Sequence, residues 1–358
     1  MSELTQESPQ RRSLERLARF LAETKENRWT VELLEDGAWP KAPYRMTERM
    51  LHALRAAIGS GRALLIKGEP GAGKSHLARA AATICERDFI ATVVQPNTEY
   101  EDLLWRIDHV ERLGEAQRLG ARAGERQRAN GEAGTVDEAG TVDEAHSPVD
   151  SLAIERFVRP GPLWFAFDPL GEHLPEPSRD VARGRITRSR GSSDSTESRR
   201  GTVLLVDEID KADASLCNGL LEALGNGGFD VPFATGSVRC ADDALPLIVL
   251  TSNDLRALPT AFLRRCVVLD LPIREEEELL EWLVTLGRTH FGAEISAPTL
   301  KSAAQRIVSE RDSHSAVRAG AAEYLDLLRA IARHGFGGDE SAEGELLDAI
   351  AAFFHKSD

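Results

Sequence analysis

A glycine-rich octapeptide, GEPGAGKS, occupies residues 68–75 and directly follows the apolar run ALLIKG. It fits the spacing G-x-x-x-x-G-K-[ST], in which backbone N–H groups and the lysine surround phosphate oxygens and the serine hydroxyl ligates Mg²⁺. The flanking sequence predicts a short buried strand before the loop and a helix that opens at Lys74, whose N-terminus attracts anions. An ordinary glycine-rich turn would not need these flanking elements. We therefore expect a phosphate-binding site made of Gly68, Glu69, Pro70, Gly71, Ala72, Gly73, Lys74, Ser75 and His76.

Two neighbouring carboxylates, Asp207 and Glu208, end a second apolar run in TVLLVDEIDKAD. At the carboxyl end of a strand beside a phosphate loop, Asp207 could hold Mg²⁺ and its water shell, and Glu208 could take a proton from an attacking water. Asp210 is the alternative base. Alone, the pattern also fits a buried strand followed by a helix cap at Asp207 or Asp210. Its occurrence together with the phosphate loop favours the metal and base roles.

Four further polar residues follow. Asn253 ends the strand-like run LPLIVLTSND and could contact a terminal phosphate or the attacking water. Arg264 and Arg265 close a short helical segment, AFLRRC, directly before another apolar run; a solvated helix end is the competing interpretation. Arg318 opens a helical segment near the C-terminus, where an ordinary surface arginine is the alternative.

The elements around these residues alternate between strand and helix. β-rich runs predict five parallel strands near residues 63–67, 89–95, 202–206, 247–251 and 266–270, with the phosphate loop at their carboxyl edge. Apolar spacing predicts helices within residues 12–35 and in MTERMLHALRAAI before the loop. From residue 274 onward only helical patterns remain, which indicates a separate helical domain. The expected division is a helical extension at 1–30, an α/β domain at 31–272 and a helical domain at 273–358.

Two polar stretches interrupt the α/β pattern. Residues 114–150 lose apolar periodicity and contain the hexapeptide EAGTVD twice in tandem. Residues 171–200 end in an arginine-rich run without aromatic residues, which favours a solvated loop over a binding arm. We expect both stretches to be disordered insertions. The aromatic segment between them, SLAIERFVRPGPLWFAFDP, should be ordered.

Composition limits which partners and which cellular compartment fit the protein. A net charge of −14 and a pI near 5.2 argue against a surface broadly adapted to nucleic acid. The four cysteines lie far apart without a C-x-x-C pair, and the polar N-terminus has no apolar signal core. No apolar run approaches the roughly 20 residues that span a bilayer. These features predict a reduced, cytoplasmic protein without a membrane segment.

The order GEPGAGKS, LLVDEIDKAD, TSND, AFLRRC and an S-x-S-x-x-R helix is similar to that of AAA+ ATPases. The GEPG start and the AFLRRC ending resemble the MoxR-like branch, and the resemblance covers about residues 31–335. It implies an AAA+ P-loop domain with a five-stranded parallel sheet and a small α-helical lid domain, with ATP and Mg²⁺ as cofactors. Asn253 then corresponds to sensor 1, Arg265, with Arg264 as the alternate, to an arginine finger acting on a neighbouring subunit, and Arg318 to sensor 2.

The resemblance also implies a ring, commonly hexameric, that hydrolyses ATP to remodel a protein client. Partners of this branch often carry a metal-dependent adhesion domain; none is evident in this sequence, so such a partner would be a separate chain. The segments NTEYEDLLWRIDHVERL and RPGPLWFAF could face the client. ATP is favoured over GTP because TSND lacks the lysine of an N-K-x-D motif. Two alternatives remain: a nucleotide-gated scaffold, against which Glu208 argues, and a nucleic-acid-directed loader, which would need a basic surface on its folded domains.

Overall fold

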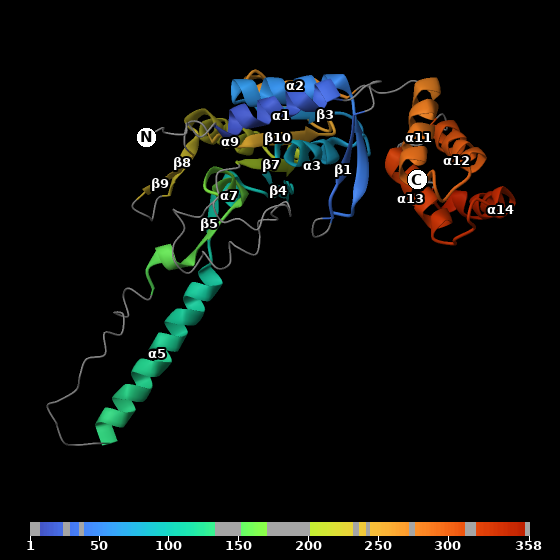
Figure 1. Ribbon diagram of the computed structural model, residues 1–358. Coiled ribbons are helices and arrows are strands. Elements are labelled where there is room, and N and C mark those ends of the chain that lie inside the picture. The colour runs from blue at the N-terminus through green and yellow to red at the C-terminus, as the bar shows by residue number, and fades with distance from the viewer. Residues whose placement is uncertain are drawn as a thin grey trace, which may run out of the picture.

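A five-stranded parallel sheet forms the centre of the computed structural model (Figure 1). The structure describes residues 8–23, 29–35, 39–132, 152–169, 201–231, 236–240, 244–271, 276–311 and 320–354. The strands are β3 (Ala63–Lys67), β4 (Asp88–Val93), β7 (Thr202–Asp207), β10 (Leu247–Ser252) and β11 (Cys266–Asp270), in the order β11-β3-β10-β7-β4. The predicted α/β fold with five parallel strands is confirmed.

Both faces of the sheet are covered by helices, which explains why its strands are almost continuously apolar. On one face, Leu64, Leu205 and Val249 belong to a core with α1 (Pro9–Glu23), α2 (Glu48–Ser60) and α3 (Lys74–Cys85). On the other face, the alternate residues Leu65, Leu204 and Leu250 belong to a core with α4 (Tyr100–Leu104), α7 (Pro162–Phe167) and α9 (Ala214–Asn226). The sheet is therefore held rigidly between two layers, and its carboxyl edge can position side chains accurately.

The helix expected within residues 12–35 is shorter than the sequence pattern suggested. Helix α1 ends at Glu23, and Trp29–Leu33 is strand β1, which pairs antiparallel with β2 (Ala42–Met46). The sequence WTVEL alternates buried and exposed residues, a period of two that suits a strand. This β1–β2 hairpin packs on α3 beside the phosphate loop.

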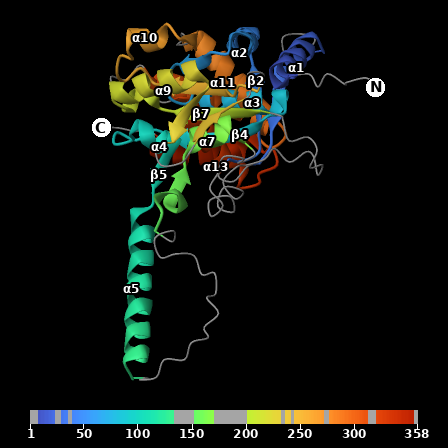
Figure 2. The ribbon, with the colours of Figure 1, turned by 90° about the vertical axis from the view of Figure 1, so that its left-hand side faces the viewer.

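A long helix, α5 (His109–Glu132), projects away from the sheet (Figures 1 and 2). The prediction of disorder across 114–150 is therefore wrong for residues 114–132, whereas residues 133–150 lie outside the described residues, as does 171–200. Ala, Arg, Glu and Gln make up most of residues 114–132 and favour helix without an apolar stripe, and they outnumber the four glycines of this stretch, which disfavour it. Asp108 caps the helix by accepting a hydrogen bond from the Glu111 N–H at 2.9 Å.

The base of α5 is fixed by the segment that returns to the sheet. Strand β5 (Trp105–Ile107) pairs antiparallel with β6 (Val158–Pro160), which follows the short helix η2 (Ile154–Phe157). Arg159 forms ion pairs with Asp108 and Glu111. Helix α7 then buries Trp164 and Phe165, so the aromatic segment is ordered as predicted.

Smaller elements complete the α/β part. Beyond β7 lie the short helix η3 (Ile209–Lys211) and helix α9, which leads into a hairpin of β8 (Gly228–Val231) and β9 (Gly236–Arg239). Helix α10 (Thr260–Leu263) precedes β11.

The C-terminal part is helical, as predicted. Helices α11 (Glu276–Phe291), α12 (Ala297–Arg311), α13 (Ala321–Ala332) and α14 (Glu340–Ile350), followed by η4 (Ala351–Phe354), enclose a core of their own. That core includes Leu283, Ile307 and Tyr324. No helix in the described part of the chain combines the length and apolar character needed to cross a bilayer.

Candidate active site

The loop between β3 and α3 requires glycine at two of its positions. Gly71 and Gly73 have φ angles of +77° and +85°, values that residues with a side chain rarely adopt. A Cβ atom on Gly73 would lie 2.9 Å from the Tyr44 ring, and one on Gly71 would lie 3.3 Å from the Ala322 nitrogen. The glycines thus let the loop pass closely between the β1–β2 hairpin and the start of α13.

Lys74, the first residue of α3, points back into this loop. Its ammonium donates hydrogen bonds to the carbonyl oxygens of Gly68 and Glu69, both at 2.8 Å, and to Asn253 Oδ1 at 2.7 Å. Burial lowers the pKa of Lys74, and neighbouring carboxylates, Asp207 foremost, oppose that shift. The sequence-predicted Lys74 and Asn253 therefore meet directly at the carboxyl edge of the sheet.

Ser75 and Asp207 are also brought together. The Ser75 hydroxyl donates to Asp207 Oδ2 at 2.8 Å, and the Thr251 hydroxyl donates to Asp207 Oδ1. A hydroxyl oxygen beside a carboxylate is the oxygen donor set that Mg²⁺ prefers. Within the described residues, no group of three or more His, Cys, Asp or Glu side chains could hold a metal ion. One hydroxyl and one carboxylate leave the other ligand positions of an octahedral ion to water and phosphate, which is how Mg²⁺ is commonly held.

Glu208 follows Asp207 in a left-handed backbone conformation, with φ of 60°. Its N–H donates to the Thr251 hydroxyl at 3.0 Å, which ties this turn to strand β10. Its carboxylate accepts a hydrogen bond from the Lys211 ammonium at 2.6 Å. Glu208 borders the cavity described below and remains 29% exposed at its side chain, so water can reach it.

Asp210, the alternative base, is buried and bonds to the backbone that follows β10. It is 1% exposed, and its Oδ2 accepts hydrogen bonds from the Asn253 N–H at 3.0 Å and the Leu255 N–H at 2.9 Å. This carboxylate fixes the backbone that carries Asn253. The sequence alone did not indicate that role, because the contact joins residues 43 positions apart.

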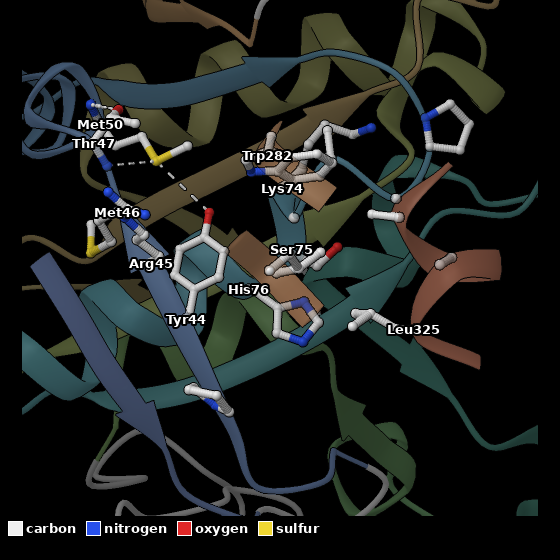
Figure 3. Close-up of a pocket in the computed structure, with 18 of the residues that line it drawn as sticks. Tyr44, Arg45, Met46, Thr47, Met50, Lys74, Ser75, His76, Trp282 and Leu325 are labelled. Carbon is white, nitrogen blue, oxygen red and sulfur yellow. Dashed lines mark hydrogen bonds between the residues drawn. The ribbon is translucent and has the colours of Figure 1, made fainter. Parts of the chain in front are cut away.

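A cavity of about 860 Å³ opens beside the loop (Figure 3). It lies between the phosphate loop, the β1–β2 hairpin and helices α11 and α13. Lys74, Ser75, Asp207, Glu208 and Asn253 line one part of it. Its other part is rich in aromatic and apolar side chains, contributed by Trp29, Trp39, Tyr44, Met50, His76, Trp282, Leu286 and Leu325.

The aromatic part is organised around His76. The rings of Tyr44 and His76 stack with centroids 5.9 Å apart and planes inclined by 23°, and Trp39 meets His76 edge-on at 6.1 Å. Burial, reinforced by the charges of Arg79 and His290, lowers the pKa of His76 to about 4. A neutral ring is thus held beside Ser75. His76 was predicted at this site from its place after the loop, whereas Tyr44 and Trp282 were not, because an aromatic residue in polar sequence surroundings is their one local signal.

The structure does not bring the two arginines proposed from the sequence for a catalytic role, Arg264 and Arg265, to this cavity. Arg264 and Arg265 are exposed between α10 and β11, and Cys266 pairs with Ala63 at the start of β3. The phosphate loop begins after Lys67, at the other end of β3, about 16 Å away at 3.3 Å per residue. Arg318 lies outside the described residues.

Comparison with known families decides the classification. A family model described as an AAA ATPase domain matches residues 43–228, more than half of the chain. The chain belongs to the AAA ATPase family. Membership implies nucleotide binding, and the matched region includes the phosphate loop and the Asp207–Glu208 turn.

Two solved structures from Thermotoga maritima resemble the chain: a RuvB mutant and the RuvB Holliday junction branch migration motor. Both are 13% identical, with TM-scores of 0.43 and 0.41. The alignments cover 87% of this chain and 71% of the first structure, and 85% and 67% for the second. None of the curated proteins compared matches the chain.

Proposed function

We propose that this AAA ATPase binds ATP with Mg²⁺ in the cavity beside the phosphate loop and hydrolyses it to ADP and phosphate. One observation carries the proposal: two strand ends and one helix start bring five polar side chains together at one edge of the sheet, those of Lys74, Ser75, Asp207, Glu208 and Asn253. Each has the chemical type that phosphoryl transfer to water requires. Coincidental packing would not give every one of them access to the same cavity.

The phosphate end would be held by Lys74 and by the loop. In this structure the Lys74 ammonium donates hydrogen bonds to two loop carbonyls and to Asn253 Oδ1. Phosphate oxygens could replace these acceptors when a nucleotide binds. The N–H groups of residues 71–75 at the N-terminus of α3 add donors with a favourable dipole.

Ser75 and Asp207 would hold Mg²⁺, which supplies charge neutralisation on the phosphates when bound. Glu208 would accept a proton from the attacking water while the water oxygen bonds to phosphorus and the bond to the leaving oxygen breaks. Asn253 would orient the terminal phosphate or the water, and Asp210 would position Asn253 through its backbone.

The aromatic part of the cavity suits a nucleobase. Tyr44, His76 and Trp282 present apolar ring surface next to the phosphate end (Figure 3). A cavity with apolar rings at one end, and the Lys74 ammonium and loop N–H groups at the other, suits the base and the phosphates of a nucleoside triphosphate. ATP rather than GTP is our choice because the sequence lacks an N-K-x-D motif.

We further propose a MoxR-like ring motor, built from an AAA+ domain at 31–272 after a short extension and a lid domain at 273–358, that remodels a protein client. The exposed Arg265, or Arg264, would act on the nucleotide of the neighbouring subunit, and Arg318 would act from the lid. Four free cysteines support a reduced compartment, which we take to be the cytoplasm.

The test separates binding from turnover. Lys74→Ala should lose ATP binding, measured by fluorescence of a labelled nucleotide, whereas Lys301→Ala, an exposed lysine of α12, should bind as the wild type does. Glu208→Gln should retain ATP while turnover falls by roughly 10² to 10⁴. Unchanged affinity in Lys74→Ala would refute the phosphate site, and undiminished turnover in Glu208→Gln would refute the base.

A further inference from the structure

One side of helix α3 faces the β1–β2 hairpin along the aromatic part of the cavity. Gly73, His76 and Arg79 follow one another at intervals of three residues, so they share this side of the helix. The Tyr44 ring lies against Gly73 and stacks on His76 (Figure 3). Helix and hairpin together therefore supply the rings at this end of the cavity.

Arg79 fastens the hairpin to the helix from a buried position. The residue is only 4% exposed. Its Nη2 donates hydrogen bonds to the Leu34 carbonyl at 2.7 Å and to the Pro40 carbonyl at 3.2 Å, near the two ends of the connection between β1 and β2. Its guanidinium carbon lies 5.3 Å from the centroid of the Trp39 ring, within the range of a cation–π contact. One side chain thus binds both the backbone of the connection and the aromatic residue in it.

Trp39 joins this contact to the cavity. Its ring borders the cavity and meets His76 edge-on, with centroids 6.1 Å apart. It also meets Phe89 of β4 edge-on, at 6.4 Å. Trp39 lies outside both strands of the hairpin, so side-chain contacts decide where its ring sits. The contact with Arg79 is the one that also holds the backbone on either side of Trp39.

A buried arginine can also serve the fold alone, and the chain contains such a case. Arg87 is 1% exposed, and it donates to Ser13 Oγ at 2.9 Å and to the Leu245 carbonyl at 3.0 Å. Neither of these partners is among the described residues that border the cavity, whereas Trp39 is. Arg79 therefore differs from Arg87 in what its contacts reach.

We propose that Arg79 is a positioning residue for the nucleobase of bound ATP, because it holds Trp39 against the His76 ring and the hairpin against α3. The proposal rests on the nucleobase site proposed above. The phosphate end is served by Lys74 and the loop, so loss of Arg79 should weaken the contacts with the base and leave those with the phosphates in place.

The experiment compares the KM for ATP with the Ki of inorganic tripolyphosphate, which competes for the phosphate end without carrying a base. In Arg79→Met, which removes the charge and the donors, we expect KM to rise about five- to tenfold, with kcat and Ki within about twofold of the wild type. Arg79→Lys keeps the charge but lacks the flat group that lies on a ring, so its KM should fall between the two. General damage to the fold would not raise KM alone. Arg79→Lys also keeps the test available if Arg79→Met does not fold.

A second pair of variants tests the path through Trp39. Trp39→Leu should raise KM as Arg79→Met does, again without a change in Ki. Because Arg79 acts through Trp39, the double variant Arg79→Lys/Trp39→Leu should have a KM close to that of Trp39→Leu alone. Multiplied effects in the double variant would overturn this path.

Arg87→Lys is the matched control, since it makes the same change at an equally buried arginine. Its KM and Ki should match the wild type even if its thermal transition falls. An unchanged KM in every Arg79 variant that folds, or an equal rise in KM and Ki, would overturn the role of Arg79 and leave the proposed ATPase intact. An unchanged KM in Trp39→Leu would overturn that role by separating Trp39 from the base. Wild-type protein without ATP turnover, or unchanged affinity in Lys74→Ala, would instead overturn the proposed function itself.

Discussion

Ser75 Oγ lies 2.8 Å from Asp207 Oδ2, so the last residue of the phosphate loop is hydrogen-bonded to a strand end 132 residues further along the chain. Strands β3 and β7 are separated in the sheet by β10 alone, which brings their carboxyl ends close together. The distance between these two oxygens would let a single small cation contact both in place of the shared proton.

We therefore expect the first effect of Asp207→Asn to be weaker Mg²⁺ binding. The amide keeps the size of the side chain but removes the charge that attracts the cation. The Mg²⁺ concentration for half-maximal turnover should rise by at least roughly tenfold. A magnesium titration of ATPase activity measures this, with Asp230→Asn on the exposed β8–β9 hairpin as the control. An unchanged titration curve would remove Asp207 from the metal site.

Asp210 should act on stability and turnover together. In Asp210→Ala, the N–H groups of Asn253 and Leu255 lose a buried charged acceptor, which should cost about 1.5–3 kcal/mol of unfolding free energy. Turnover should also fall, because Asn253 is no longer held against Lys74. Urea unfolding and ATPase assays on the same preparations check both effects. Glu208→Gln provides the contrast, since it should lose turnover without a comparable loss of stability.

The parts of this structure that were predictable from sequence depend on local pattern. The apolar runs and the glycine spacing predict strands such as Ala63–Lys67 and the loop after it, because a buried strand and a positive φ each restrict residue type locally. The contacts of Asp210 and the approach of Tyr44 to Gly73 depend on tertiary packing. No spacing rule in one sequence encodes such contacts.

Helix α5 shows a different limit. Disorder was predicted for its greater part because apolar periodicity stops near Gly114, yet the backbone continues as helix to Glu132. Helix propensity and ion pairs such as Arg118 with Glu115 favour helix without a buried face. Periodicity detects helices that pack on a core, and this helix projects away from one (Figure 2).

The outer part of α5 should be dispensable for the fold and for basal ATPase activity. The Arg112 Nε donates to the Leu152 carbonyl at 3.2 Å, so the two ends of the insertion already lie side by side near its base. Deleting residues 116–146 leaves β5, β6 and the ion pairs of Arg159 in place. We expect one cooperative thermal transition within a few degrees of the wild type, and kcat within about twofold.

A wider deletion, of residues 105–161, supplies the comparison. It removes the β5–β6 pair on which α4 and α7 converge, so it should expose the apolar surface around Trp164 and lower the transition temperature. Equal damage from both deletions would mean that the outer helix contributes to the core fold, contrary to this prediction.

Arg265 lies at the amino end of the sheet, whereas the phosphate loop follows its carboxyl end, so one chain cannot supply both to the same nucleotide. If Arg265 acts on a neighbouring subunit, Arg265→Ala should bind ATP normally yet lose turnover by roughly 10³ to 10⁵, the usual effect of a finger supplied by a second protein. Specific activity of the wild type should also rise with protein concentration. Arg264→Ala identifies which arginine is responsible, because its neighbour then remains in place.

The decisive measurement for a shared site mixes Arg265→Ala with Lys74→Ala. Each variant should be inactive alone, but a mixed assembly places the intact loop of one subunit against the intact arginine of the next. Partial recovery of ATPase activity would support a shared site. No recovery despite demonstrated co-assembly, together with activity independent of concentration, would leave Arg265 as an exposed helix-end residue and would remove the argument for a ring.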